Sequence, residues 1–302
     1  MTKSMKVGLI GAGLMGHGIG KNIVEKGHSL AVLAHRNRQP IEDLVGRGAT
    51  EAKTPRQLAE ACDIVITVVT ASPQLEEVVY RDDGLLAGAH KGLVMADCTT
   101  ASPLSTARIA ADLAAKGGRF VDIPLTGTPK EAEAGTLTIM AGGDAATLAK
   151  IRPVLDCFAT SFIHCGGVAA GHQVKLINNF LGLSIAATTA EAFCCAAKAG
   201  VSIKALRDVV ATGGVNSGIF QRMAASALEN DDSSFKFKIG TAQKDLRYYT
   251  AMADALPSTS FIAEAVHQTY ILASNLGLGD QFVPRLIDAL GKVNGVDPRA
   301  KP

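Results

Sequence analysis

The sequence lacks a concentration of charge of either sign. Its 302 residues include 30 lysines and arginines against 28 aspartates and glutamates, a formal net charge of +2, and the basic residues form no long run. A protein that binds nucleic acid usually presents a concentrated basic face. The composition therefore argues against a nucleic-acid partner and predicts that an anionic ligand meets a few placed cations.

The sequence also lacks the cysteine spacing of a disulfide framework or a structural zinc site. Its six cysteines form no CxxC pair and stand within apolar runs. Cys157, His164 and Cys165 resemble half of a zinc site, but no second pair of ligands follows at suitable spacing. We therefore predict no metal and reduced, mostly buried thiols, as in a cytoplasmic protein.

Neither a secretory leader nor a membrane anchor is expected. Residues 1–20 combine lysines with an apolar stretch, but no small-residue cleavage site follows. Residues 176–197 are long and apolar enough to cross a membrane. Asn178, Asn179 and Glu191 would be costly in lipid, and the sequence has one such segment only. This segment is predicted to be a buried helix of a soluble protein that has no membrane partner.

The first half of the chain alternates short apolar runs with amphipathic segments. Strands are expected at residues 6–10, 29–34, 64–69, 92–97, 119–123 and 137–141, and helices at 16–26, 55–61 and 103–116. Alternation of this kind predicts an α/β fold with a doubly wound parallel sheet.

The second half of the chain loses the strand signals. Long helical patterns follow one another at residues 173–199, 203–211, 218–228, 238–255, 261–275 and 283–290. We predict a sheet domain over residues 1–166 and an all-α domain over residues 167–302, which begins with a long interdomain helix. A cleft between two such domains is a common place for a ligand.

A glycine pattern follows the first expected strand and opens the first expected helix. It is a G-x-G-x-x-G made by Gly11, Gly13 and Gly16, with Leu14 and Met15 in the turn. The first glycine permits a tight turn, the second lets the backbone approach a pyrophosphate, and the third allows close helix–strand packing. The N-terminus of the helix attracts the phosphates. The pattern predicts a Rossmann-type dinucleotide site.

The end of the second expected strand favours NADP over NAD. An acidic residue there would bind the ribose 2′-hydroxyl and repel a 2′-phosphate. The sequence instead continues His35-Arg36-Asn37-Arg38. Arg36 is able to hold a phosphate through two hydrogen bonds, with His35 before it and Arg38 close behind. We predict NADP as the cofactor, with NAD possible; the alternative interpretation is a solvated basic loop.

Four separated motifs together resemble the β-hydroxyacid dehydrogenase family. They are the glycine pattern with its helix through Asn22, the pair 122–127 (DIPLTG) and 134–140 (AGTLTIM), residues 171–179 (GHQVKLINN), and residues 244–246 (KDL). The resemblance covers essentially the whole chain. It implies an NAD(P)-dependent oxidoreductase that interconverts a short β-hydroxy acid and its semialdehyde, of the 2-hydroxy-3-oxopropionate or 3-hydroxyisobutyrate type.

The resemblance implies that Lys175 is the catalytic acid/base. The residues themselves agree, because Lys175 and Asn179 are four apart on a helix and share a face, with Asn178 adjacent. Polar side chains on an apolar helix need partners, which a cleft supplies. A lysine can give or take the alcohol proton in step with the hydride. The alternative is an ordinary salt-bridge lysine.

The resemblance also implies that a serine–glycine–glycine turn binds the substrate carboxylate. This chain has Thr126-Gly127-Thr128 at that place. Thr126 keeps the hydroxyl and joins Lys175 and Asn179 in the expected catalytic set, while Thr128 adds bulk and a second hydroxyl. The expected substrate-binding residues are Thr126, Gly127, Thr128, Asn178 and Asn179, and residues near Ser217, Phe220 and Phe237 are expected to shape the pocket.

Further cofactor contacts are implied at five positions: Val69, Thr70, Gln74, Thr100 and Lys244. The family more often has Leu-Pro where this chain has Val69-Thr70. Asp245 is expected to orient Lys244 or to pair with a neighbour. The long apolar helix favours burial against a second copy of the chain, so a homodimer or homotetramer is expected.

Two alternative functions use the same scaffold. The first is reduction of another aldehyde, such as a sulfonate-bearing one, or of an imine, and the changed turn at Thr126 and Thr128 favours it. The second is a non-catalytic assembly module, which the presence of Lys175 argues against.

Overall fold

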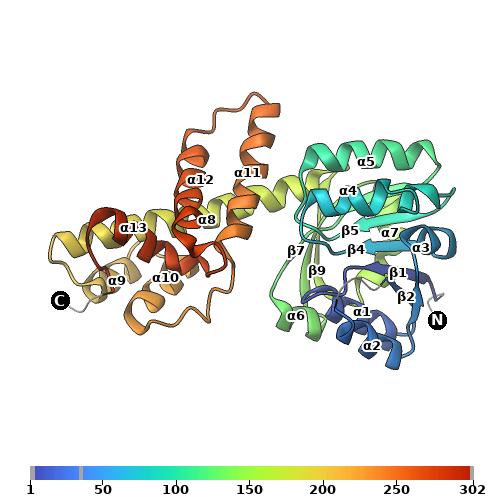
Figure 1. Ribbon diagram of the computed structural model, residues 1–302, viewed down its shortest axis with the longest axis horizontal. Coiled ribbons are helices and arrows are strands. Elements are labelled where there is room, and N and C mark those ends of the chain that lie inside the picture. The colour runs from blue at the N-terminus through green and yellow to red at the C-terminus, as the bar shows by residue number, and fades with distance from the viewer. Residues whose placement is uncertain (1–3, 34–36, 300–302) are drawn as a thin grey trace. The chain divides into compact units, whose positions relative to one another are not determined.

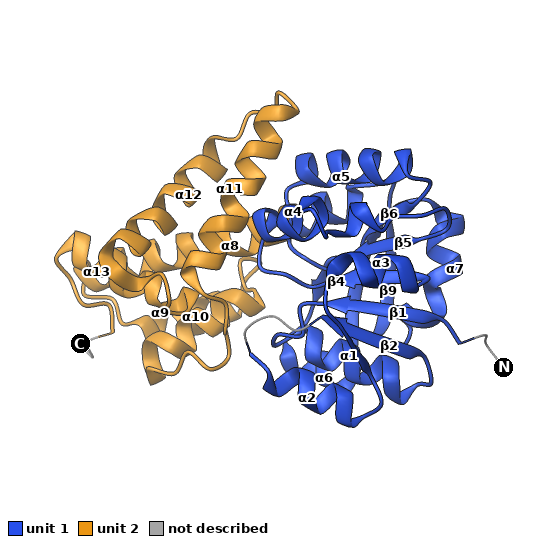
Figure 2. Ribbon diagram, turned by 45° about the vertical axis from the view of Figure 1, so that its right-hand side comes forward, with its two compact units in different colours: residues 1–175 blue, residues 176–302 orange. Residues whose placement is uncertain are grey.

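The chain forms two compact units. The computed structural model describes residues 4–33 and 37–299, and the units are Met1–Lys175 and Leu176–Pro302 (Figure 2). They divide inside the long helix α8 (Ala170–Lys198), whereas the sequence places the boundary at residues 166–167. The predicted His35 and Arg36 lie outside the described residues.

Within its described residues, the first unit contains a nine-stranded sheet (Figure 1). The strand order is β3-β2-β1-β4-β5-β6-β8-β7, with β9 paired to β8. All pairs from β3 through β6 are parallel, which confirms the expected fold class, while β8 is antiparallel to β6 and β7. The strands are β1 Lys6–Ile10, β2 Ser29–Leu33, β3 Thr50–Ala52, β4 Ile64–Thr67, β5 Val94–Asp97, β6 Arg119–Asp122, β7 Leu125–Thr126, β8 Leu137–Gly142 and β9 Ala159–Gly166.

Helices cover both faces of this sheet because the central strands are apolar on both sides. In β4, Ile64 and Ile66 join one apolar core and Val65 joins the other, as the two-residue period of a strand requires. Ile19 of α1 packs in the first core, and Leu75 of α4 packs in the second. The helices of this unit are α1 Gly16–Glu25, α2 Gln39–Gly46, α3 Pro55–Ala61, α4 Ser72–Tyr80, α5 Pro103–Ala115, α6 Pro129–Ala134 and α7 Ala145–Leu155.

The second unit is helical and is organised around α8. This helix has the length and apolarity of a membrane span, but Leu183, Ala190 and Phe193 place it in the core of the unit. Its Ile177 and Leu181 are 44% and 58% exposed. The remaining elements are α9 Ile203–Ala211, α10 Gly218–Glu229, α11 Ile239–Ala255, α12 Phe261–Ala273, the π-helical turn Ser274–Leu278, the short 3-10 turn Val283–Arg285 and α13 Leu286–Asn294.

All six cysteines are free thiols. Four are buried, Cys165 is half-buried and Cys195 is exposed. His164 bonds through Nε2 to the main-chain carbonyls of Gly143 and Gly166. In the part of the chain that the structure describes, no three His, Cys, Asp or Glu side chains gather where they could hold a metal ion.

Candidate functional site

A cavity of about 470 Å³ lies at the carboxyl ends of β1 and β4. These strands are neighbours from which the sheet grows in opposite directions, the usual place for a ligand in a doubly wound fold. The structure brings five of the predicted cofactor residues together in its lining: Gly11, Gly13, Val69, Thr70 and Gln74. We call this space the switch-point cavity. Thr100 is half-buried in the neighbouring loop after β5.

The three glycines of the turn differ in the space that a side chain would find at each position. Gly11 has a φ of 98°, and a Cβ there would lie 2.2 Å from the carbonyl oxygen of Val68. A Cβ on Gly16 would lie 1.9 Å from the carbonyl oxygen of Gly11, so this glycine permits the close helix–strand approach. A Cβ on Gly13 would meet nothing within 4 Å. The open side of the turn at Gly13 therefore leaves room for a ligand, and the residues present fit a dinucleotide.

The two residues that follow the turn lie at the start of α1. Leu14 is 81% exposed, and Met15 is the N-cap residue of the helix without a side-chain hydrogen bond there. A helix start of this kind presents main-chain N–H groups and a partial positive charge to an anion.

Basic side chains on or next to the lining of the switch-point cavity differ in the partners that they bind. Arg38 makes a two-pronged contact with Glu51, with N–O distances of 2.7 and 2.9 Å. Its guanidinium is therefore committed to a neighbouring strand. Lys53 and Arg81, unlike Arg38, are among the residues that line the cavity, although the sequence did not single them out, and Arg81 pairs with Asp83.

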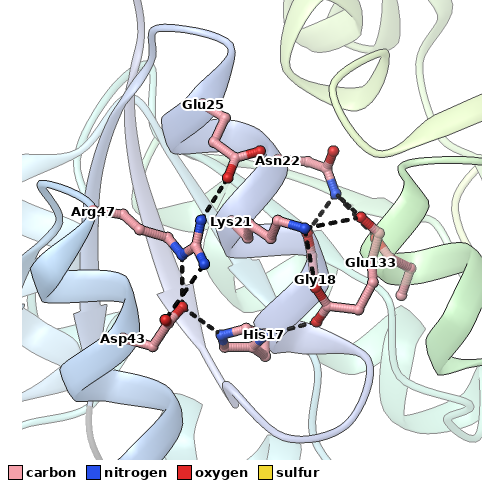
Figure 3. A network of polar contacts seen from close by, with 9 residues as sticks. His17, Gly18, Lys21, Asn22, Glu25, Asp43, Arg47 and Glu133 are labelled. Carbon is pink, nitrogen blue, oxygen red and sulfur yellow. Dashed lines mark hydrogen bonds and ion pairs between the residues drawn. The ribbon is translucent and has the colours of Figure 1, made fainter.

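A network of polar contacts joins α1 to α2 and α6 (Figure 3). His17 lies 2.6 Å through Nδ1 from Glu133 Oε1 and 2.9 Å through Nε2 from Asp43 Oδ2. Burial alone would lower the pKa of His17, but the bonds to Glu133 and then to Asp43 outweigh it and raise the pKa. Asn22 donates to the carbonyls of Ala132 and Glu133. These contacts hold α1, the helix that follows the glycine turn, against α6, the helix that follows the predicted substrate turn.

In the predicted substrate turn, Thr126-Gly127-Thr128, the two threonines have different surroundings. Thr126 is exposed at the end of β7, and Gly127 has a φ of 134°. Thr128 is the N-cap of α6: its oxygen accepts from Lys130 N, and both its hydroxyl and its N–H bond to the Glu131 carboxylate. The second hydroxyl of the turn therefore stabilises a helix start, as in a capping box.

Lys175 lies beside this turn. Its Nζ donates a 2.8 Å hydrogen bond to the carbonyl oxygen of Leu125, the residue before Thr126. The first turn of α8 is fixed by Asp122, whose two carboxylate oxygens accept from Ala169 N at 2.7 Å and from His172 N at 2.8 Å. The first unit thus brings the predicted acid/base and the predicted substrate turn together.

The second unit holds the predicted amides and the lysine of the third helical motif. Asn179 donates through Nδ2 to Asp245 Oδ2 at 2.7 Å. Lys244 Nζ lies 3.0 Å from Asp245 Oδ1, which makes the two side chains an ion pair. Asp245 is 2% exposed. Asp245 therefore holds both Asn179 and Lys244, as the sequence motif suggests for the lysine.

A second cavity, of about 300 Å³, lies within this unit. Asn178 and Asn179 share its lining with Phe237 and with apolar residues such as Ile219. Of the other residues expected to shape a pocket, Phe220 is buried in the helical core and Ser217 caps α10.

Two family models match adjacent parts of the chain. The NAD binding domain of 6-phosphogluconate dehydrogenase matches residues 6–167. The second model, described as the NAD-binding part of NADP-dependent 3-hydroxyisobutyrate dehydrogenase, matches residues 169–290.

Individual proteins are similar over most of their length. The chain is 28% identical to 3-sulfolactaldehyde reductase of Escherichia coli, over 98% of this chain and 99% of the relative. It is 33% identical to 2-hydroxy-3-oxopropionate reductase of Escherichia coli, over 83% and 85%. The solved structure of Mycobacterium tuberculosis 3-hydroxyisobutyrate dehydrogenase with L-serine superposes with a TM-score of 0.85 at 26% identity, covering 95% of this chain and 99% of that one.

Proposed function

Because the chain belongs to the β-hydroxyacid dehydrogenase family of NAD(P)-dependent oxidoreductases, we propose that it interconverts a short-chain β-hydroxy acid and its semialdehyde, preferring NADP. The observation that carries the proposal is the position of Lys175, whose Nζ bonds to the main chain directly before the Thr126 turn. A proton donor beside a turn that can bind a carboxylate is what reduction of a semialdehyde acid requires.

The cofactor would be held by the residues of the switch-point cavity. Gly11, Gly13, Gly16 and the start of α1 at Leu14 and Met15 would receive the pyrophosphate. Arg36, with His35 beside it, would bind the 2′-phosphate of NADP. Val69, Thr70, Gln74, Thr100 and Lys244 would contact the remainder. When bound, the nicotinamide supplies or accepts the hydride.

The substrate would be oriented by the turn and by the amides of α8. The Thr126 hydroxyl and the backbone N–H groups at Gly127 and Thr128 would bind the carboxylate. Lys175 gives a proton to the carbonyl oxygen as the carbonyl carbon receives hydride, and takes the alcohol proton in the reverse direction. Asn179, one helical turn after Lys175, would bind the same oxygen, with Asn178 beside it.

A second candidate is reduction of a sulfonate-bearing aldehyde. The similarity to 3-sulfolactaldehyde reductase extends over nearly the full length of both proteins, and the turn here carries Thr126 and Thr128 in place of the family's serine and glycine. The Thr128 hydroxyl is engaged with Glu131, so any change in anion preference would come from Thr126 and the bulk of Thr128.

We propose further that the protein is a soluble cytoplasmic homodimer or homotetramer without a nucleic-acid or membrane partner. Ile177 and Leu181 are exposed on α8, a helix long and apolar enough to cross a membrane. Their burial against a second copy would remove apolar area from water.

The proposal is tested by initial rates on a panel of C3 to C5 semialdehyde acids, the matching hydroxy acids and 3-sulfolactaldehyde, each with both cofactors. We expect Lys175→Ala to lower kcat by at least about a hundredfold, the scale of a lost acid/base group, while NADPH still binds. Lys198→Ala, at the exposed far end of the same helix, is the matched control and should retain activity. Near-normal turnover in Lys175→Ala would remove that lysine from the mechanism.

A further inference from the structure

A group of polar side chains without exposed surface lies beneath the start of α8. Thr67, Asp97 and Asp122 end the three neighbouring strands β4, β5 and β6 and stand opposite one another in the sheet. These three residues and His172 are all 0% exposed. Burying ionisable groups costs free energy unless hydrogen bonds or ion pairs compensate. Apolar packing alone therefore does not account for this cluster.

The ring of His172 joins α5 to β5. Its Nδ1 lies 2.8 Å from Thr106 Oγ1, and its Nε2 lies 3.5 Å from Asp97 Oδ2. Neither Nε2 nor Asp97 Oδ2 has a hydrogen-bond partner among the described residues. Asp122 Oδ2 lies 4.0 Å from Nδ1 and is already bonded to the main chain of α8. His172 Nε2 and Asp97 Oδ2 therefore face each other, and neither atom is bonded to a third group among the described residues.

The other oxygen of Asp97 organises two loops. Asp97 Oδ1 accepts from Thr67 Oγ1 at 2.7 Å and from Thr99 N at 3.1 Å. Thr99 Oγ1 in turn accepts from Val69 N at 3.1 Å. These contacts tie the loop after β4 to the loop after β5, which carry the expected cofactor residues Thr70 and Thr100. Burial raises the pKa of Asp97, and the hydrogen bonds from Thr99 and Thr67 oppose that rise.

Lys175 follows His172 by three residues on α8, so the two side chains leave neighbouring positions on the helix surface. Asp122 fixes the main chain of this first turn. The ring of His172 adds a contact to β5 that fixes how the turn is rotated about its axis. A change in that rotation would move Lys175 Nζ relative to the substrate turn.

We propose that His172 and Asp97 are positioning residues: their contact holds the first turn of α8, and with it Lys175, in a fixed place relative to the loops after β4 and β5. The proposal rests on the function proposed above for Lys175. In it, neither residue touches the reacting atoms. The pair instead couples the position of the acid/base to the position of the loops that would hold the cofactor.

The first test is hydrogen–deuterium exchange of the free protein and a fluorescence titration with NADPH, which need no substrate. In His172→Leu we expect faster amide exchange both at residues 170–175 and at residues 98–101, and weaker NADPH binding. His172→Gln keeps polar atoms toward Thr106 and Asp97 and should restore much of the protection. His267→Leu is the matched control, because it removes another buried imidazole, in the second unit, whose Nε2 has no hydrogen-bond partner among the residues that the structure describes.

The second test is steady-state kinetics on the substrate found with the panel. We expect His172→Leu to lower kcat on the order of tenfold to a hundredfold, the scale of a small misplacement of a catalytic group, with KM for the acid nearly unchanged. Asp97→Asn should act through the same contact, so the double variant should lose less than the sum of the two singles. Additive losses, or an unchanged kcat, would overturn the proposal.

The two tests separate failure of the proposed function from failure of this inference. If the wild type turns over nothing on the panel, the proposed function fails, and the exchange and NADPH measurements still decide the coupling. Faster exchange confined to residues 170–175, with residues 98–101 as in the wild type, would show no coupling. If His172→Leu does not fold, Thr106→Val replaces it, because that variant removes the partner of Nδ1.

Discussion

The two units use a buried carboxylate in different ways. In the sheet unit, Asp122 accepts from two main-chain N–H groups at the start of α8. In the helical unit, Asp245 contacts two side chains, those of Asn179 and Lys244. Both residues are almost without exposed surface. A carboxylate bonded to main chain stabilises the fold, whereas one bonded to side chains mainly sets where those side chains lie.

The largest expected effect comes from making the same change in both units. Asp122→Asn leaves one buried N–H without an acceptor and should lower the free energy of unfolding by about 1–3 kcal/mol, as measured by urea unfolding. Asp245→Asn keeps an oxygen for the Asn179 amide, so its stability loss should be smaller, while kcat falls because Lys244 loses its charge partner. If the two variants lost equal stability and equal activity, the proposed difference between the two carboxylates would be wrong.

Two arginines of the sheet unit extend the comparison to the choice of cofactor. Arg36→Asp should change the NADP-to-NAD ratio of kcat/KM about tenfold to a hundredfold toward NAD, because it removes charge-assisted bonds to the 2′-phosphate. Arg38→Ala is the control: Arg38 is held by Glu51, and the ratio should stay near the wild-type value. An unchanged ratio in Arg36→Asp would show that another residue reads the phosphate, with Lys53 the next to test.

The smallest expected effect concerns the network around His17. Its pKa is raised in the folded protein, so the stability that its contacts contribute is complete below about pH 6.5 and is lost as the pH rises through the folded value. Asp43 has a pKa of about 2, lowered by Arg47 and then by His17, so its contribution is lost only toward that acidic pH. The melting temperature of His17→Gln should fall about 1–2 °C below the wild type near pH 5.5 and approach it above pH 8.

The exposed His90, whose ring bonds to the main-chain carbonyl of Lys91, is the control for that measurement. His90→Gln breaks no ion pair among the described residues, so it should not reproduce the loss of melting temperature near pH 5.5. A pH-independent difference in His17→Gln would mean that its ion pairs contribute nothing to stability.

Much of the fold follows from local patterns. The strand at Lys6–Ile10 and the helices at Pro55–Ala61 and Ile203–Ala211 have the predicted bounds, because a two-residue or a 3.6-residue period is visible within one segment. The helix Gln39–Gly46 and the strand Ala159–Gly166 were not predicted. The first is a short helix of eight residues with only two buried, and the second is a partly exposed strand whose burial does not alternate.

The candidate site also has parts that the sequence indicates and parts that it does not. The glycine turn after β1 and the loop after β4 meet at the switch-point cavity, because the carboxyl ends of parallel strands share one edge of the sheet. The contact between Asp97 and His172 was not predicted. Asp97 ends an apolar strand and His172 lies within the motif at residues 171–179, but nothing in the sequence indicates that the two side chains meet.

The sequence by itself determined the alternation of strands and helices in the first half, the helical second half, the glycine turn, and the place of Lys175 and Asn179 on one helix. These are properties of neighbouring residues, and backbone geometry converts them directly into structure. Only the tertiary structure decided which polar side chains meet: Arg38 bonds to Glu51, and Asp97 lies 3.5 Å from His172, 75 residues further along the chain. Partner choice depends on how separate elements pack, and no local period encodes the rotamers that bring two distant side chains together.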